Sequence, residues 1–147
     1  MNYSTVNGNL IFIKYLVEEK SMDIHSDNDY VFNISCSRHC SRHCSRHYKD
    51  ITKYVISLTN WYKYINKALI EYAHSGDIDF VKDMIEMGGD VASNNNEGII
   101  WAAGFGHIEM VKYLLKNGAI LNKHRAIELA RQNKHKEMIS SLEALTT

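Results

Sequence analysis

Residues 102–119 read AAGFGHIEMVKYLLKNGA, and residues 72–89, thirty positions earlier, read YAHSGDIDFVKDMIEMGG. Both stretches place a small residue, a glycine and a polar residue before an apolar and charged segment that ends at another glycine. A pattern that recurs at a fixed spacing of about 30 residues is typical of proteins built from stacked structural repeats. The sequence therefore predicts that this chain is assembled from copies of one short unit.

Each copy reads as two short helices joined by a tight turn. Apolar residues recur at helical spacing on both segments of the best-preserved copy: Ile99, Ala102 and Ala103 on the first, and Ile108, Val111, Leu114 and Leu115 on the second. Gly76 and Gly106 stand between the segments, where glycine closes a turn at little steric cost. No stretch alternates apolar and polar residues long enough for a buried strand, so we predict an all-α fold. One helix pair cannot bury its apolar face alone, and stacked neighbours can.

Less regular copies extend the pattern over nearly the whole chain. Residues 7–17 match the second half of the unit, residues 130–139 form a polar copy, and residues 48–55 match a second helix. The last of these is separated from its expected first helix by two units of the tetrapeptide SRHC at 37–44. We predict one domain, 1–147, with units at 1–27 (partial), 28–64 (carrying the insertion at 37–44), 65–94, 95–122 and 123–147 (a C-terminal cap).

Two histidines occupy equivalent positions at the start of second helices. His107 and His135 stand where other copies have Asn9, Tyr48 or Asp77. Because several polar groups serve at this position, we predict a capping or inter-repeat hydrogen bond there rather than catalysis.

The repeat resembles the ankyrin repeat family. The residues that carry the resemblance are Ala68-Leu69, Tyr72-Ala73, Gly76, Val81, Met84-Ile85 and Gly88 in one unit, and Ile99, Ala102-Ala103, Gly106-His107, Val111, Leu114-Leu115 and Asn117-Gly118-Ala119 in the next. The usual Thr-Pro-Leu-His opening of the first helix is absent, and Asp29–Phe32 and Glu97–Ile100 stand in its place. The resemblance implies an all-α solenoid of stacked helix–turn–helix repeats with short polar connections, acting in protein–protein recognition without catalysis.

A narrower resemblance points to a viral source. The units near 30 residues, the Val-Lys-Tyr-Leu segment at 111–114, the His25–Tyr30 segment and the abundance of Asn, Ile, Lys and Tyr are similar to ankyrin proteins of giant viruses that infect amoebae. The resemblance implies a viral protein that engages an unidentified host protein, inside the host cell and in its cytoplasm.

Composition narrows the function classes. The chain has 147 residues, 17 basic and 17 acidic side chains and no proline, and the zero net charge does not favour nucleic-acid binding. The longest apolar run, at 99–103, has five residues, so we expect no membrane span, and no signal-peptide pattern opens the chain. Three cysteines, an odd number gathered at 36–44, favour a reducing compartment. No catalytic motif appears, so we expect no enzyme, and we expect a monomer.

Partner contacts are expected at the connections and the adjoining first helices, by resemblance to the family. Aromatic side chains are over-represented among residues that dominate binding energy. The candidate contact residues are His25, Asp27, Asn28, Tyr62, Lys63, Tyr64, Asn94, Asn95, Asn96, Trp101, Lys123 and His124.

The inserted segment offers an alternative function. Thiolate and imidazole are the ligands that zinc prefers, and six such residues fall within twelve positions: Cys36, His39, Cys40, His43, Cys44 and His47. The spacing is unlike known zinc fingers, which bring ligand pairs from two elements. A passive, expanded helix with solvated side chains is the preferred explanation of the segment. We therefore expect no cofactor, and keep zinc binding or a redox-sensitive element as one alternative and a decayed paralogue without a selected role as another.

Overall fold

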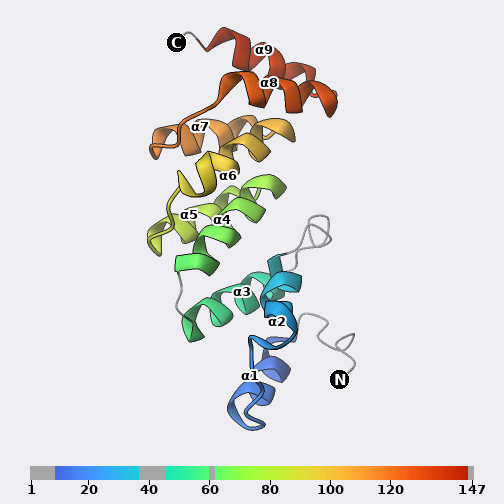
Figure 1. Ribbon diagram of the computed structural model, residues 1–147, viewed down its shortest axis with the longest axis vertical. Coiled ribbons are helices and arrows are strands. Elements are labelled where there is room, and N and C mark those ends of the chain that lie inside the picture. The colour runs from blue at the N-terminus through green and yellow to red at the C-terminus, as the bar shows by residue number, and fades with distance from the viewer. Residues whose placement is uncertain (1–8, 37–45, 60–61, 146–147) are drawn as a thin grey trace. The chain divides into compact units, whose positions relative to one another are not determined.

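A computed structural model describes residues 9–36, 46–59 and 62–145, with the side chains of 26–28 and 46–47 outside the description. The described residues form helices joined by turns, with no strand among them, so the predicted all-α class is confirmed (Figure 1). The helices are α1 (Leu10–Glu18), α2 (Ser26–Cys36), α3 (Arg46–Leu58), α4 (Tyr62–Ser75), α5 (Ile78–Glu86), α6 (Ser93–Gly104), α7 (Ile108–Lys116), α8 (Lys123–Gln132) and α9 (Lys136–Ala144).

The chain forms two compact units, Met1–Tyr64 and Ile65–Thr147. In the first, α3 packs against both α1 and α2. Its core is aliphatic and aromatic: Ile13, Leu16, Val31, Phe32, Ile51, Val55 and Ile56 are buried. A small polar contact crosses this core, because the Thr52 hydroxyl donates to Ser35 Oγ at 3.0 Å, and both side chains are fully buried.

The second unit contains the regular repeats. In it α6 packs against α7 and α8, α8 against α9, and α5 against α7, as Figure 1 shows for this end of the chain. The predicted apolar faces meet in its core, where Leu69, Phe80, Val81, Met84, Ile99, Ala102, Ala103, Met110, Val111, Leu114, Ala126, Ala130, Met138 and Leu142 are buried. Burial of each large aliphatic side chain contributes about 1.5–3 kcal/mol, so neighbouring helix pairs stabilise one another.

The turn between the two helices of a repeat lies close to a histidine ring of the next repeat. Gly76 and Gly106 have positive φ angles of 80° and 81°, and Lys134 adopts φ 63° at the equivalent place. A Cβ atom on Gly76 would lie 2.6 Å from Nδ1 of His107, and one on Gly106 would lie 2.7 Å from Nδ1 of His135. The absence of a side chain at these glycines therefore allows both the left-handed backbone and the close approach of the histidine ring from the following repeat.

His107 makes an inter-repeat hydrogen bond. Its Nε2 donates to the carbonyl oxygen of His74 in the preceding repeat at 2.9 Å. It precedes α7 at the N-cap position without forming a side-chain cap, whereas Asp77 caps α5 by accepting from the Phe80 amide at 3.2 Å. Of the two roles predicted for this position, the structure gives His107 the inter-repeat one and Asp77 the cap.

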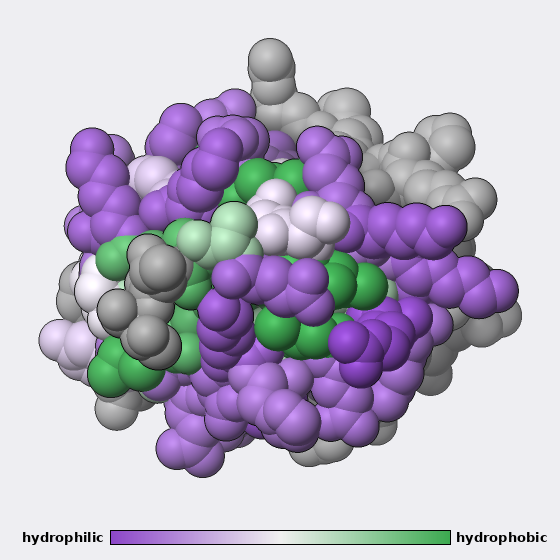
Figure 2. All heavy atoms as spheres, turned by 90° about the horizontal axis from the view of Figure 1, so that it is seen from above, coloured by the Kyte–Doolittle hydropathy of each residue, from purple (hydrophilic) through white to green (hydrophobic). Residues whose placement is uncertain are grey.

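The last helix pair presents a polar outer face. Lys134, Lys136, Glu137, Ser140 and Glu143 are exposed. Figure 2 looks down from this end and shows hydrophilic atoms over most of the face, with hydrophobic atoms gathered near its centre.

Candidate functional site

The connection before α6 has an unusual backbone. Asn94, Asn95 and Asn96 adopt consecutive left-handed conformations, with φ of 51°, 56° and 60°. Most L-residues pay about 1–2 kcal/mol each for this conformation, and asparagine is among the side chains that tolerate it best. The run of three asparagines predicted as a contact segment is therefore also the reason the chain can turn here.

Asparagine side chains also join successive connections. Asn96 Oδ1 accepts from the Ile120 amide at 2.6 Å, and Asn66 Oδ1 accepts from the Asp90 amide at 2.8 Å. The two bonds are thirty residues apart and each spans 24 residues of sequence. In two successive repeats, an asparagine side chain at the equivalent position thus holds the backbone of the following connection. The side chain of Asn96 therefore has a structural role.

A hydrogen-bonded chain leads from this connection to an aromatic side chain. The side-chain Nδ2 of Asn94 donates to one carboxylate oxygen of Glu97, and Trp101 Nε1 donates to the other at 2.9 Å. The Trp101 ring stands edge-on to buried His74, with centroids 5.6 Å apart, and beside Phe105 at 6.1 Å. Trp101 is partly exposed, so the ring is held in one orientation and still reaches the surface.

We call Asn94, Asn95, Glu97, Trp101 and Ile120 the tip surface. Asn94 and Asn95 are exposed, and the Ile120 side chain is 72% exposed although it is aliphatic. Amides, a fixed indole and an exposed aliphatic side chain are groups that protein partners bind. Ile120 and Glu97 are absent from the sequence-based candidates. The thirty-residue spacing of Asn66 and Asn96 is the signal that could have led to Ile120.

The candidates on α8 differ in availability. Lys123 Nζ donates to the carbonyl oxygens of Glu143 and Leu145, at 3.2 and 2.8 Å, and so covers the C-terminal end of α9. His124 is exposed. His124 therefore offers more of its side chain to a partner than Lys123 does.

Candidates in the first unit converge on one carboxylate. Asp29 Oδ1 accepts from Tyr64 OH at 2.6 Å and from His25 Nδ1 at 2.7 Å, and Asp29 Oδ2 lies 3.6 Å from Lys63 Nζ. Hydrogen bonds from Tyr64 and then His25 hold the pKa of Asp29 below its usual value. Burial, with the Asp29 carboxylate adding to it, raises the pKa of Tyr64 to about 12.

Only some of the candidate residues around this cluster are exposed enough to contact a partner. Tyr64 is 7% exposed, so its ring belongs to the packing of the unit and stands edge-on to Phe32 at 4.7 Å. Tyr62 is 65% exposed and the Lys63 side chain 75% exposed. The side chains of Asp27 and Asn28 lie outside the described residues. The sequence missed Asp29 because its partners His25 and Tyr64 are brought together only by the fold.

Of the six cysteines and histidines predicted as possible zinc ligands, Cys36 alone has its side chain among the described residues. Cys36 is buried, with its Sγ 3.6 Å from Thr52 Oγ1. His39, Cys40, His43 and Cys44 lie outside the described residues, as does the side chain of His47. Within the part of the chain that is described, no three His, Cys, Asp or Glu side chains gather as a metal site would require. Zinc binding by these residues stays a prediction.

Comparison with known proteins agrees with the architecture. The family model for ankyrin repeats in three copies matches residues 69–144, which is about half of the chain. An ankyrin repeat protein of Acanthamoeba polyphaga mimivirus, L675, is 25% identical over 93 residues, and the match spans 63% of this chain and 20% of that protein's length. No solved structure matches.

The family settles the general character of the molecule. Ankyrin repeats are generally protein–protein interaction modules, typically without enzymatic activity and without a cofactor. In the described residues, no helix combines the length and the apolar character that crossing a bilayer needs. The predicted resemblance is confirmed by the repeat model and by the giant-virus relative: this chain belongs to the ankyrin repeat family.

Proposed function

We propose that this protein is a non-catalytic scaffold of viral origin that binds a host protein through the tip surface. The observation that carries the proposal is the fixed orientation of Trp101, whose indole is tied to Glu97 while its ring remains partly exposed. A side chain that is ordered before binding loses little conformational entropy when a partner docks, and this favours affinity. The viral relative supports a host cell as the place of action, and the clustered cysteines, which favour a reducing compartment, support its cytoplasm.

The test is capture from an amoebal lysate with quantitative mass spectrometry. The full chain is compared with Trp101→Ala, with Ile120→Asp and with Lys82→Ala, which alters a half-exposed lysine of α5 that pairs with Asp79 outside the tip surface. We expect a small set of host proteins to be recovered by the wild type and Lys82→Ala, and to be depleted at least about tenfold by either tip variant, because centrally packed aromatic contacts carry about 2 kcal/mol or more. Recovery that is equal for all four chains would contradict the proposal.

We also propose that the scaffold works as a monomer and without a metal. Sedimentation of the purified chain tests the first point. Elemental analysis of the reduced, untagged protein beside a Cys40→Ser/Cys44→Ser variant tests the second. One zinc per chain, lost in the variant, would replace this part of the proposal with a metal-linked function at the insertion.

A further inference from the structure

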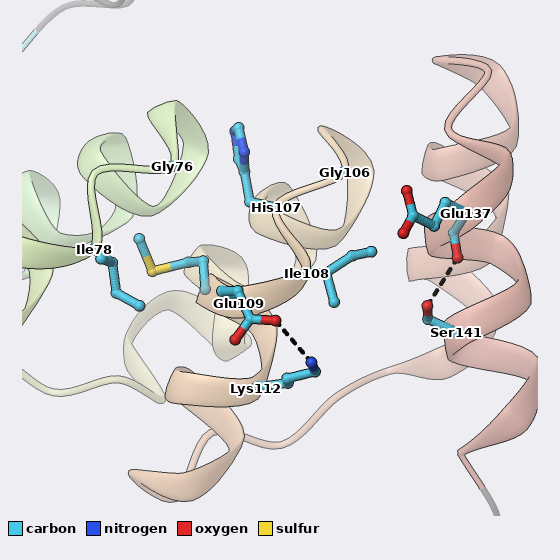
Figure 3. A pocket seen from close by; sticks show the side chains of 10 residues that line it. Gly76, Ile78, Gly106, His107, Ile108, Glu109, Lys112, Glu137 and Ser141 are labelled. Atoms are coloured by element: carbon cyan, nitrogen blue, oxygen red, sulfur yellow. Dashed lines mark hydrogen bonds and ion pairs between the residues drawn. The ribbon is translucent and has the colours of Figure 1, made fainter.

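A hollow of about 560 Å³ runs along the second helices of the second unit (Figure 3). It spans three repeats: Ile78 begins α5, His107 and Ile108 open α7, and Glu137 and Ser141 lie on α9. We call it the outer-helix groove. None of the tip-surface residues lines it.

The groove has an apolar floor made by the repeat itself. Ile78 and Ile108 occupy equivalent positions thirty residues apart, and both are only partly buried. Figure 3 shows Ile108 extending from α7 toward the helix that carries Glu137 and Ser141. An aliphatic side chain from another molecule would remove these two isoleucines from water, which is favourable in proportion to the area covered.

His107 contributes no positive charge to this floor near neutral pH. Its Nε2 is bonded to the His74 carbonyl oxygen and its ring packs on Gly76. Burial is the main cause that holds the pKa of His107 below its ordinary value of 6.5. The imidazole therefore stays neutral, and the charged side chains that line the groove are Glu109, Glu137 and Lys112.

The remaining charges leave one carboxylate available. Lys112 Nζ donates to Glu109 Oε1 at 2.7 Å, so these two charges compensate each other. Ser141 Oγ donates to the backbone oxygen of Glu137 and not to its carboxylate. The Glu137 carboxylate points toward the hollow in Figure 3 and has no ion-pair partner among the described side chains. Among the side chains that line the groove, Glu137 therefore leaves an uncompensated negative charge at the end formed by α9.

We propose that the outer-helix groove docks a protein segment that presents an aliphatic side chain next to a lysine or arginine. The aliphatic group would rest on Ile78 and Ile108, and the cation would pair with Glu137. A segment with a carboxylate in that place would meet a like charge and be disfavoured. This site is separate from the tip surface, so it stands or falls independently of the proposed function.

The test is selection of a phage-displayed library of random dodecapeptides on the immobilised full chain. Recovered peptides should carry Lys or Arg within two positions of Leu, Ile, Val or Met. Ser141→Trp, which fills the groove, should weaken their binding at least about tenfold, and Glu137→Gln roughly two- to fivefold, as expected for a partly exposed ion pair. Glu143→Gln on the same helix is the matched control and should leave binding unchanged.

Each other outcome overturns the proposal. Peptides that bind Ser141→Trp and the wild type equally well must dock outside the groove. Acidic or uncharged peptides whose binding is weakened by Ser141→Trp would contradict the role of Glu137. Failure to recover any peptide contradicts the site itself. Glu137→Lys guards against misfolding of the tryptophan variant, because it changes only an exposed side chain and should still exclude basic peptides by about tenfold or more.

Discussion

At the scale of single residues, the turn glycines of the second unit are constrained twice. Gly76 has a left-handed backbone and faces the His107 ring, whereas Gly88 has φ 95° and nothing within 4 Å of the place its Cβ would take. Substitutions at these two glycines therefore distinguish the effect of a left-handed backbone, which both share, from the effect of steric contact with the next repeat, which only Gly76 has.

Gly76→Ala is expected to destabilise the protein more than Gly88→Ala. A left-handed alanine lowers the free energy of unfolding by about 1–2 kcal/mol in both variants. In Gly76→Ala, overpacking against His107 lowers it by roughly 1–3 kcal/mol more. Urea unfolding measures both. In a His107→Ala background the extra cost of Gly76→Ala should disappear, and equal costs in the wild-type background would show that the ring yields freely.

The pH dependence of stability is expected to report on His107. Because burial lowers its pKa in the folded state, the unfolded chain takes up a proton more readily. The contribution of the neutral ring is therefore complete above the ordinary value of 6.5 and is lost as the pH falls from there through the folded pKa. Unfolding free energies of the wild type and His107→Gln between pH 8 and 5 should converge on acidification, and a constant difference would contradict the burial effect.

At the scale of elements, side chains from one connection hold the backbone of the next. Asn95→Ala and Asn96→Ala both place alanine in a left-handed turn, and only Asn96 also bonds the Ile120 amide. Asn96→Ala is expected to cost about 1 kcal/mol more, the usual net value of one hydrogen bond, and to speed hydrogen exchange at Ile120. Unchanged exchange there would rule out this bond as the link between the connections.

The start of α4 is expected to depend on Asp29 in a way that titration can follow. Asp29→Asn should bring the pKa of Tyr64 down from about 12, because the carboxylate that favours the protonated phenol is gone. Tyr54, whose pKa is also about 12 through burial and Glu18, is the internal control. NMR of labelled tyrosine measures both, and a Tyr64 titration that does not move would place the whole effect in burial.

The same carboxylate has a defined effect on acid stability. Because hydrogen bonds lower the pKa of folded Asp29 below 3.8, its contribution is present above that value and is lost as the pH falls through the folded pKa.

At the scale of the whole molecule, the sequence predicted what the repeat period determines. The helical segments, the turns at Gly76 and Gly106 and the buried faces follow from local pattern, because every copy meets the same neighbours. The contact of Tyr64 with Asp29 and the bond from Asn96 to Ile120 did not follow, because the partners lie 35 and 24 residues apart in the sequence and are brought together only by the fold.

The candidate surface was predicted only in part for the same reason. Resemblance to the ankyrin family led to Asn94, Asn95 and Trp101, and the structure adds that Glu97 accepts a hydrogen bond from the indole. Composition could not separate Lys123, which covers the end of α9, from exposed His124, because both look alike as polar connection residues. Availability to a partner is a property of tertiary contacts that no single-residue pattern encodes.

The central claim is that Trp101 belongs to a partner-binding surface. The most direct measurement is the dissociation constant of the most enriched captured host protein for the purified wild type, Trp101→Ala and Lys82→Ala. We predict that Trp101→Ala weakens binding at least about tenfold and that Lys82→Ala changes it less than about twofold. Binding that is unchanged by Trp101→Ala would contradict the account and move the interface away from the tip surface.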